Sequence, residues 1–296
     1  MPAEPRAVDP IDRSVAATLD RSRLLLEGKG VPSALVDAEL LVGHVLGLSR
    51  GGVQAKAVTG TLLSPDDVIT ISELVERRAA REPLQHIVGR APFRGIELAV
   101  GPGVFVPRPE TEGVAQLAID ALAAVASPSP IGVDLGTGSG AIALAMATEV
   151  PHATVVGVEV SPRAFVWTKQ NFREVGAPNA RAVFIDLAHA LPELDGTVDV
   201  VISNPPYIPL GMVPRDPEVR LHDPEIALYG GEDGMDVLRH VSATARRLLR
   251  RGGTLVLEHG EQQAAQVAAL LESDGWTAIA SHRDALGRDR ATTALR

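Results

Sequence analysis

Apolar residues recur at helical spacing through the first part of the chain, over residues 11–81. Val15 and Leu19 are examples of this pattern. Ser64 followed by Pro65 is typical of a helix start, because the serine hydroxyl caps backbone N–H groups and proline fits the first turn. The pattern predicts a small all-α bundle.

Glycine and proline interrupt this pattern over residues 89–108, where short apolar runs occupy positions 96–100 and 104–106. Short apolar runs between turn-forming residues are typical of strands in a hairpin or linker. We therefore predict an N-terminal helical domain over residues 1–88, followed by a β-hairpin linker over residues 89–108.

From about Thr111 the chain alternates between helical patterns and apolar runs of strand length. The predicted strands are residues 131–135, 154–159, 182–185, 198–203 and 254–258, and the predicted helices are residues 111–125, 141–148, 161–175, 233–250 and 262–273. Such alternation predicts an α/β domain over residues 109–296, Rossmann-like, with a mostly parallel sheet and helices on both faces. Ligands of such sheets bind at the carboxyl ends of the strands.

A glycine-rich loop follows the first predicted strand of this domain. It reads Gly136, Thr137, Gly138, Ser139 and Gly140. Glycines at such a turn let a ligand approach backbone N–H groups closely. Glu159 ends the next predicted strand, where an acid would hold the hydroxyl groups of a ribose. These features predict a nucleotide-type cofactor without deciding which one, and a plain tight turn is the structural alternative.

Two residues after the third predicted strand complete this candidate site. The carboxylate of Asp186 is placed to accept a hydrogen bond from an adenine amino group, and Leu187 is placed to cover the ring. The alternative for Asp186 is a solvated loop acid, which loops favour.

The strand at residues 198–203 ends in the sequence Asn204-Pro205-Pro206-Tyr207. Asn204 precedes a proline and is pushed toward extended geometry, and neither proline has an N–H group. The turn therefore presents acceptors, namely backbone carbonyls and the Asn204 side-chain oxygen, beside the flat ring of Tyr207. We expect it to bind a planar primary amine or amide. A proline-rich loop after a core strand is the alternative.

Such a turn is suited to methyl transfer onto nitrogen. When two oxygen atoms accept hydrogen bonds from both N–H groups, the remaining face of the nitrogen points toward an incoming methyl group. As positive charge grows on the nitrogen these hydrogen bonds strengthen, which contributes roughly 2–4 kcal/mol to transition-state stabilisation. We predict Asn204, Pro205 and Tyr207 as catalytic residues and Pro206 as a further substrate contact.

Composition and charge narrow the possible classes of function. The chain has 296 residues, a net charge of −9 and no cysteine. An acidic chain is a poor partner for bare nucleic acid, so we expect no stable nucleic-acid binding. The N-terminal sequence MPAEPRAVDPIDR lacks a signal-peptide core, and no run approaches the roughly 20 apolar residues of a membrane span. We expect a cytoplasmic protein with no membrane contact and, because its histidines lack ligand spacing, no metal.

Taken together, these motifs resemble those of the peptide chain release factor glutamine N5-methyltransferases, over nearly the whole chain. The Asn204–Tyr207 turn by itself resembles a wider group that methylates amino nitrogens of bases or of glutamine. The narrower resemblance is carried by the segments REPLQHIVG at 81–89, PGVFVPRPETE at 102–112, GGEDG at 230–234, LEHG at 257–260 and GRDR at 287–290. His86, Glu159 and Leu187 are mild departures from the family pattern.

The resemblance implies S-adenosylmethionine as cofactor and S-adenosylhomocysteine as product. The residues implied to contact the cofactor are Asp134, Gly136, Thr137, Gly138, Ser139, Gly140, Glu159, Asp186, Leu187 and Asn204. Asp134 is typical of enzymes that use this cofactor, in which the acid orders the glycine loop; a turn-capping role is the alternative.

The implied substrate is the glutamine of the Gly-Gly-Gln loop in class I bacterial release factors. Asn204, Pro205, Pro206 and Tyr207 would hold its amide, and the N-terminal helical domain would help to recognise the partner. Arg108 and Glu110 either shape the substrate pocket or pin the linker. We interpret Glu258, His259 and the GRDR segment as structural.

Three other classes remain open from the sequence. An N6-adenine DNA or RNA methyltransferase would share the Asn204–Tyr207 turn but would need a basic groove. A dehydrogenase that uses NAD would share the glycine loop but has no use for that turn. A regulator that binds the cofactor without turnover would keep its function after Asn204→Ala.

Overall fold

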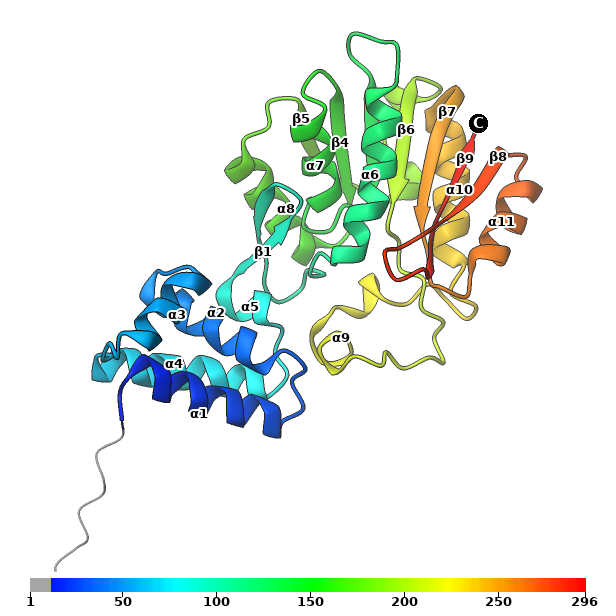
Figure 1. Ribbon diagram of the computed structural model, residues 1–296. Helices are drawn as coiled ribbons and strands as arrows, with labels where there is room; N and C mark the ends of the chain where they lie inside the picture. Colours follow the sequence, from blue (N-terminus) through cyan, green and yellow to red (C-terminus); the bar gives the residue numbers. More distant parts are fainter. Residues whose placement is uncertain (1–11) are drawn as a thin grey trace, which may run out of the picture. The chain divides into compact units, whose positions relative to one another are not determined.

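The computed structural model describes residues 12–296, and the chain divides into two compact units between Val88 and Gly89 (Figure 1). The absence of a signal-peptide core was inferred largely from residues 1–11, which lie outside the described part. Among residues 12–296, none of the helices combines the length and apolarity that crossing a membrane requires.

The first unit is a helical bundle, as predicted. Its helices are α1 (Val15–Gly28), α2 (Ala34–Leu46), α3 (Arg50–Val58), α4 (Pro65–Ala79) and α5 (Leu84–Val88). Ser64 caps α4 through a capping box with Asp67, and Pro65 occupies the first turn. Inside the bundle the buried side chains of Asp37 and Arg78 form an ion pair at 2.7 Å.

A two-stranded antiparallel hairpin begins the second unit. Strand β1 (Arg90–Phe93) pairs with β2 (Ile96–Ala99). The predicted strand at residues 104–106 is wrong: this segment is irregular. Val104 and Val106 are fully buried in a cluster with Ala91 and Val100, so tertiary packing rather than strand pairing explains why this run is apolar.

The rest of this unit is built on one mostly parallel sheet of seven strands, in the order β5-β4-β3-β6-β7-β9-β8. The strands are β3 (Ile131–Leu135), β4 (Thr154–Glu159), β5 (Ala180–Phe184), β6 (Val198–Ser203), β7 (Leu249–Glu258), β8 (Thr277–Arg283) and β9 (Asp289–Leu295). Strands β3 to β7 run parallel, whereas β9 pairs antiparallel with β7 and β8. This topology confirms the predicted α/β fold, and the two terminal strands are an addition to it.

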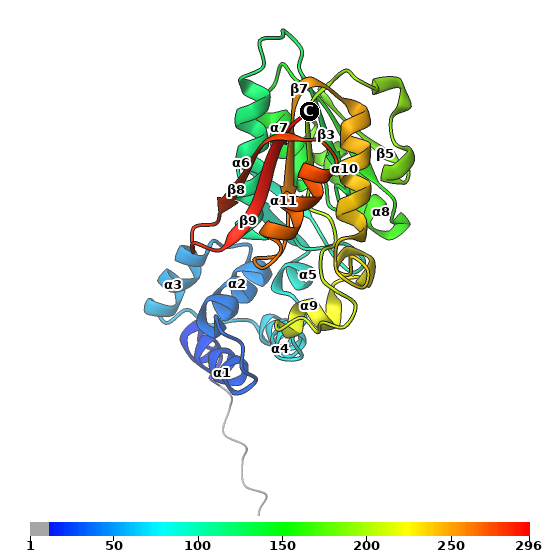
Figure 2. The same ribbon diagram turned by 90° about the vertical axis from the view of Figure 1, so that its right-hand side faces the viewer.

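Helices cover both faces of the sheet. They are α6 (Pro109–Ala123), α7 (Ala141–Glu149), α8 (Pro162–Val175), α10 (Asp236–Leu248) and α11 (Ala264–Ser273). Side chains along β6 alternate between the two cores: Val200 and Ile202 pack with α6 and α7, and Val201 packs with α10 and α11. Figure 2 shows α6 and α10 on opposite sides of the sheet.

The position of the site follows from this strand order. β3 is a direct neighbour of both β4 and β6, and Asp134 lies opposite Ile202 in the β3–β6 register. The loops that leave β3 and β6 therefore begin side by side. This is the point where the strand order changes direction, which is where open α/β sheets bind ligands.

Candidate active site

A cavity of about 990 Å³ lies at the carboxyl ends of β3, β4 and β6. Its volume is at the upper end of the range for small-molecule sites, so it has room for a nucleotide-sized cofactor and a substrate side chain. The predicted site residues that line it are Arg108, Glu110, Gly136, Thr137, Gly138, Ser139, Glu159, Asp186, Leu187, Asn204, Pro206 and Tyr207. Asp134, Gly140 and Pro205 lie outside its lining.

The glycine loop between β3 and α7 has a backbone that requires glycine. Gly136, Gly138 and Gly140 have φ angles of 78°, 56° and 89°, in the left-handed region. A Cβ atom on Gly136 or Gly138 would meet no atom within 4 Å, whereas one on Gly140 would lie 2.8 Å from the ring of Phe172. The first two glycines are thus open on the side where a Cβ would stand, and the third allows close packing on α8.

Polar side chains of α8 hold the carbonyl groups of this loop. Thr168 Oγ1 donates to Gly138 O at 2.6 Å, and Asn171 Nδ2 donates to Ser139 O at 2.8 Å. Thr168 and Asn171 were not predicted as site residues. They lie three positions apart on a helix, and such a polar pair on one helix face was the available signal.

The carboxylate of Glu159, at the end of β4, accepts hydrogen bonds from three backbone N–H groups. Its Oε2 accepts from Gly138 N at 2.8 Å, and its Oε1 accepts from Val160 N at 2.9 Å and from Ser161 N at 2.7 Å. Glu159 therefore joins the glycine loop to the start of α8. Each oxygen of a carboxylate has two acceptor sites, and Oε2 uses only one, so Glu159 can also accept from a ligand hydroxyl group through Oε2.

Asp134 lies beneath the glycine loop and is fully buried. Its Oδ2 accepts from Thr137 Oγ1 at 2.6 Å and from Ala143 N at 3.2 Å. Burial raises the pKa of Asp134 to about 7, against the effect of these two hydrogen bonds. Its Oδ1 has no hydrogen-bond partner among residues 12–296. In the structure Asp134 acts on the loop, and a direct contact with the cofactor stays a prediction.

Asp186 and Leu187 form the part of the cavity that follows β5. Asp186 Oδ1 accepts from Ala188 N at 2.9 Å and so caps a short 3-10 helix, Leu187–His189. Leu187 is half-buried and packs against the core on the α10 side. Both residues line the wall of the cavity, and their contact with an adenine stays a prediction.

The Asn204–Tyr207 turn is held from several sides. Tyr207 O accepts from Gln263 Nε2 at 3.0 Å, and Pro206 O lies only 2.5 Å from where a Cβ on Gly230 would stand. Glycine at position 230 therefore lets this segment pack directly on the turn. The carbonyl of Pro205 accepts no hydrogen bond from residues 12–296.

Three residues that were interpreted as structural or passed over lie beneath this turn. Thr111 Oγ1 donates to Glu258 Oε1 at 3.2 Å, and Arg290 Nη1 donates to the Tyr207 hydroxyl at 3.4 Å. Burial raises the pKa of Glu258 to about 7 and that of Tyr207 to about 12. Glu258 ends β7, the neighbour of β6, so its place at a carboxyl strand end was the available signal.

Arg108 connects the linker to the long loop after β6. Its Nη2 donates to the buried Asp223 Oδ2 at 2.7 Å, and its guanidinium lies 4.9 Å from the ring centre of Phe105. Burial raises the pKa of Asp223 to about 6, and the charge of Arg108 opposes this shift. The same loop contains a short helix, α9 (Pro217–His222). Arg108 thus pins the linker, and it also lines the cavity.

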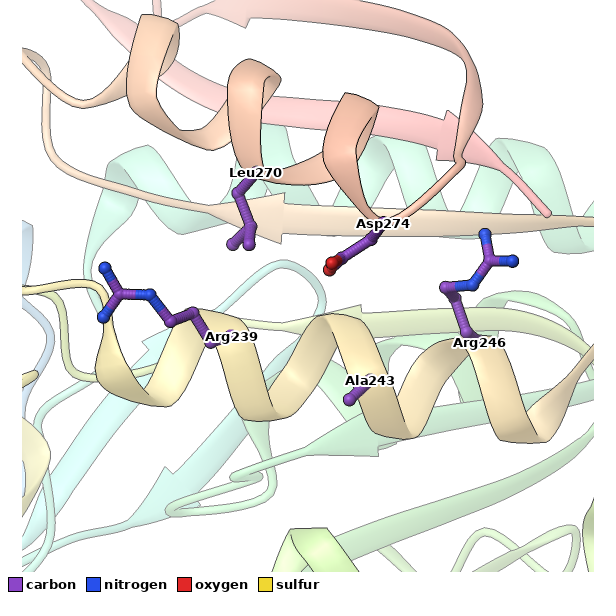
Figure 3. A pocket seen from close by; sticks show the side chains of 5 residues that line it. All are labelled: Arg239, Ala243, Arg246, Leu270 and Asp274. Atoms are coloured by element: carbon purple, nitrogen blue, oxygen red, sulfur yellow. The ribbon is translucent and has the colours of Figure 1, made fainter.

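A second, smaller hollow of about 430 Å³ lies between α10 and α11 (Figure 3). Arg239 pairs with Asp233 and Asp236, and Asp274 accepts from Ser242. The guanidinium of Arg246 lies 5.6 Å from the ring centre of Trp276, and its Nη1 has no hydrogen-bond partner among residues 12–296. None of the predicted site residues lines it. Residues 12–296 also contain no group of three His, Cys, Asp or Glu side chains arranged to hold a metal ion.

Two family models match the chain. The PrmC N-terminal domain matches residues 17–89, and the methyltransferase small domain matches residues 96–211. The second match includes the glycine loop and the Asn204–Tyr207 turn. The helical unit and the methyltransferase unit are thus each recognised separately.

Three relatives align with the chain over more than nine-tenths of its length. A release factor glutamine methyltransferase of Streptomyces coelicolor is 49% identical, covering 91% of this chain and 93% of the relative. A release factor glutamine methyltransferase of Bifidobacterium longum is 43% identical, covering 93% of this chain and 92% of the relative. A 4-amino-L-phenylalanine/4-methylamino-L-phenylalanine methyltransferase of Streptomyces pristinaespiralis is 40% identical, covering 96% of this chain and 95% of the relative. With these identities and this coverage, the chain belongs to the release factor glutamine methyltransferase family.

Proposed function

We propose that the protein transfers a methyl group from S-adenosylmethionine to the side-chain N5 nitrogen of the glutamine in the Gly-Gly-Gln loop of class I release factors. The observation that carries this proposal is a single cavity lined both by the glycine loop after β3 and by the Asn204–Tyr207 turn after β6. The family of the chain supports the reaction and the protein substrate.

The residues around the first half of the cavity fit the cofactor. Gly136 and Gly138 have no atom within 4 Å of where a Cβ would stand, so a ligand can approach the loop backbone closely. Glu159 would hold the ribose, and Asp186 with Leu187 would hold the adenine. S-adenosylmethionine, when bound there, supplies an electrophilic methyl group carried on a sulfonium.

The residues of the second half would hold the glutamine amide. Asn204 Oδ1 would accept one of its two N–H protons and a carbonyl of the proline pair, Pro205 or Pro206, the other, while the ring of Tyr207 supports its plane. These two bonds orient the nitrogen lone pair and strengthen as the nitrogen becomes positive. The raised pKa of Tyr207 keeps its phenol neutral, so the ring serves as a surface and not as a base.

A second substrate class is favoured by one specific observation. The Streptomyces pristinaespiralis relative is named for an aromatic amine substrate and is as similar to this chain, at 40% identity, as a release factor enzyme at 39%. An aniline-type NH2 group is also planar and also offers two N–H protons. The two substrates differ in size and in the need for a protein partner.

The test is a methyl-transfer assay with labelled S-adenosylmethionine. The purified protein is incubated in parallel with an intact release factor, the same factor with its Gly-Gly-Gln glutamine changed to alanine, 4-amino-L-phenylalanine, and duplex DNA. We expect label only on the intact factor. Label on 4-amino-L-phenylalanine alone would show that the substrate is an aromatic amine. Label on DNA alone would show that the enzyme methylates adenine.

A further inference from the structure

A chain of hydrogen bonds behind the cavity connects Asn204 to a buried carboxyl group. Asn204 Nδ2 donates to Thr111 Oγ1 at 3.3 Å, and Thr111 Oγ1 donates to Glu258 Oε1 at 3.2 Å. Thr111 and Glu258 are only 4% and 2% exposed. They belong to α6 and β7, so this contact exists only in the folded molecule.

The direction of this chain is determined by its last member. A threonine hydroxyl has one proton, and Glu258 Oε1 takes it. The lone pairs of Thr111 Oγ1 are then left for Asn204, and they select the NH2 end of its amide. The Oδ1 atom of Asn204 therefore remains available to a ligand in the cavity, because Asn204 is one of the residues that line it.

We propose that Thr111 and Glu258 are positioning residues that keep the Asn204 amide oriented with Oδ1 toward the substrate nitrogen. This inference rests on the proposed function, in which Oδ1 accepts an N–H of the substrate amide. A reversed amide would place its NH2 group against the substrate NH2 group, so that donors would face donors. It would also repel the positive charge that grows on the nitrogen.

The surroundings of Glu258 are consistent with this role. Glu110 on α6, Arg290 on β9 and the Tyr207 phenol interact with it electrostatically, and the side chain of Asn204 also acts on it directly as a hydrogen-bond donor that lowers its pKa. Its Oε2 has no hydrogen-bond partner among residues 12–296, so a proton can reside there while Oε1 still accepts from Thr111. In the charged form both oxygens only accept, so the direction of the chain is fixed, whereas a proton adds a donor to the carboxyl group. The charged form is the stronger acceptor, and its negative charge favours the developing cation.

The test compares Thr111→Val, which keeps the shape and removes the hydroxyl group, with Thr111→Ser, which retains it. Thr244→Val is the matched control, since Thr244 is also 4% exposed but lies on α10 outside the cavity lining. The wild-type protein must first methylate the release factor, so that a failure of the proposed function is seen separately. We then expect Thr111→Val to lower kcat about tenfold or more, and Thr111→Ser to recover most of the loss.

Further readouts separate positioning from a general structural effect. Affinity for S-adenosylmethionine and the unfolding temperature should change little in Thr111→Val, as in Thr244→Val. In an Asn204→Ala background, Thr111→Val should lower kcat no further, because its effect acts through Asn204. A Thr111→Val protein that turns over within about twofold of wild type, or losses that multiply in the double variant, would overturn the proposal.

A second variant keeps the proposal testable if Thr111→Val does not fold. Glu258→Gln retains the shape but can donate to Thr111, which removes the fixed direction of the chain. We expect kcat of the wild type to rise with pH through about 7, where Glu258 loses its proton. Glu258→Gln should have a lower kcat and lack this rise. An unchanged kcat and an unchanged pH profile in Glu258→Gln would overturn the inference.

Discussion

At the scale of single residues, the candidate site depends on which atoms are already engaged by the protein. Tyr207 O is bound by Gln263, and Asn204 Nδ2 is bound by Thr111. Asn204 Oδ1 and the carbonyls of Pro205 and Pro206 are acceptors at this turn that receive no hydrogen bond from residues 12–296. Two acceptors beside a flat ring match a primary amide, which has two donors in one plane.

Replacing Asn204 removes one of these acceptors and should act on the chemical step. We expect Asn204→Ala to lower kcat by about 100-fold or more, because a bond that strengthens in the transition state is lost. Affinity for S-adenosylmethionine, measured by calorimetry, should change less than about fivefold. Tyr207→Phe is the matched control: it keeps the flat ring and should lose less than about fivefold. Near-normal turnover by Asn204→Ala would contradict the assigned role.

The buried carboxyl group of Asp134 should make stability depend on pH. Its pKa is raised from 3.8 to about 7 in the folded state, mainly by burial. The folded protein therefore retains a proton that the unfolded chain releases, and this contribution to stability is complete below about pH 4 and lost as pH rises through about 7.

The comparison that isolates this group is wild type against Asp134→Asn in urea unfolding. Between about pH 5 and pH 8, we expect the free energy of unfolding of the wild type to fall relative to the variant by roughly 2–4 kcal/mol. A difference between the two proteins that stays constant over this range would show that Asp134 titrates normally.

At the scale of elements, the loop from β3 to α7 uses its glycines for different purposes. Gly136 lies at the cavity wall with open space beside it, whereas Gly140 packs against Phe172 of α8. Side chains of α8 and the carboxylate of Glu159 then hold the loop in place. The ligand-binding backbone is thus shaped by two neighbouring elements.

Alanine substitutions should separate these two purposes. Gly140→Ala is expected to lower the free energy of unfolding by roughly 2–4 kcal/mol, since it combines left-handed backbone strain with overlap against Phe172. Gly136→Ala should cost only about 1–2 kcal/mol but weaken S-adenosylmethionine binding. Thermal unfolding and calorimetry measure the two effects. Equal stability losses in the two variants would argue against the packing role of Gly140.

At the scale of the whole molecule, the large cavity belongs to one of the two compact units. Among the described residues, every residue that lines the large cavity belongs to Gly89–Arg296. The helical unit has its own core, with Leu26, Leu41 and Ile71 fully buried. A role of the helical unit in recognising the release factor remains our proposal.

Separating the units tests this division. A fragment that begins at Gly89 should bind S-adenosylmethionine with an affinity within about threefold of the full chain, because it retains the whole cavity lining. Its KM for the release factor should rise about tenfold or more, since the contacts proposed for the helical unit are missing. An unchanged KM would remove the helical unit from substrate recognition.

The fold was largely predictable because its signals are local. Strands β3, β4 and β6 were predicted with their observed limits, and α8 ends at Val175 as predicted, where Gly176 caps it. The error at Val104 and Val106 has a physical cause: an apolar run indicates burial, and burial does not require a strand. The terminal strands β8 and β9 were not assigned, since their exposure alternates weakly along the chain.

The sequence alone determined the two ends of the site, because glycines at a turn and prolines after a strand act on their own backbone. Only the tertiary structure decided what supports them. Thr111 and Glu258 lie 147 positions apart, and no local pattern indicates that they meet. Their contact exists because β7 pairs with β6 and α6 packs on the sheet. Long-range packing therefore determines the direction of the Asn204 amide.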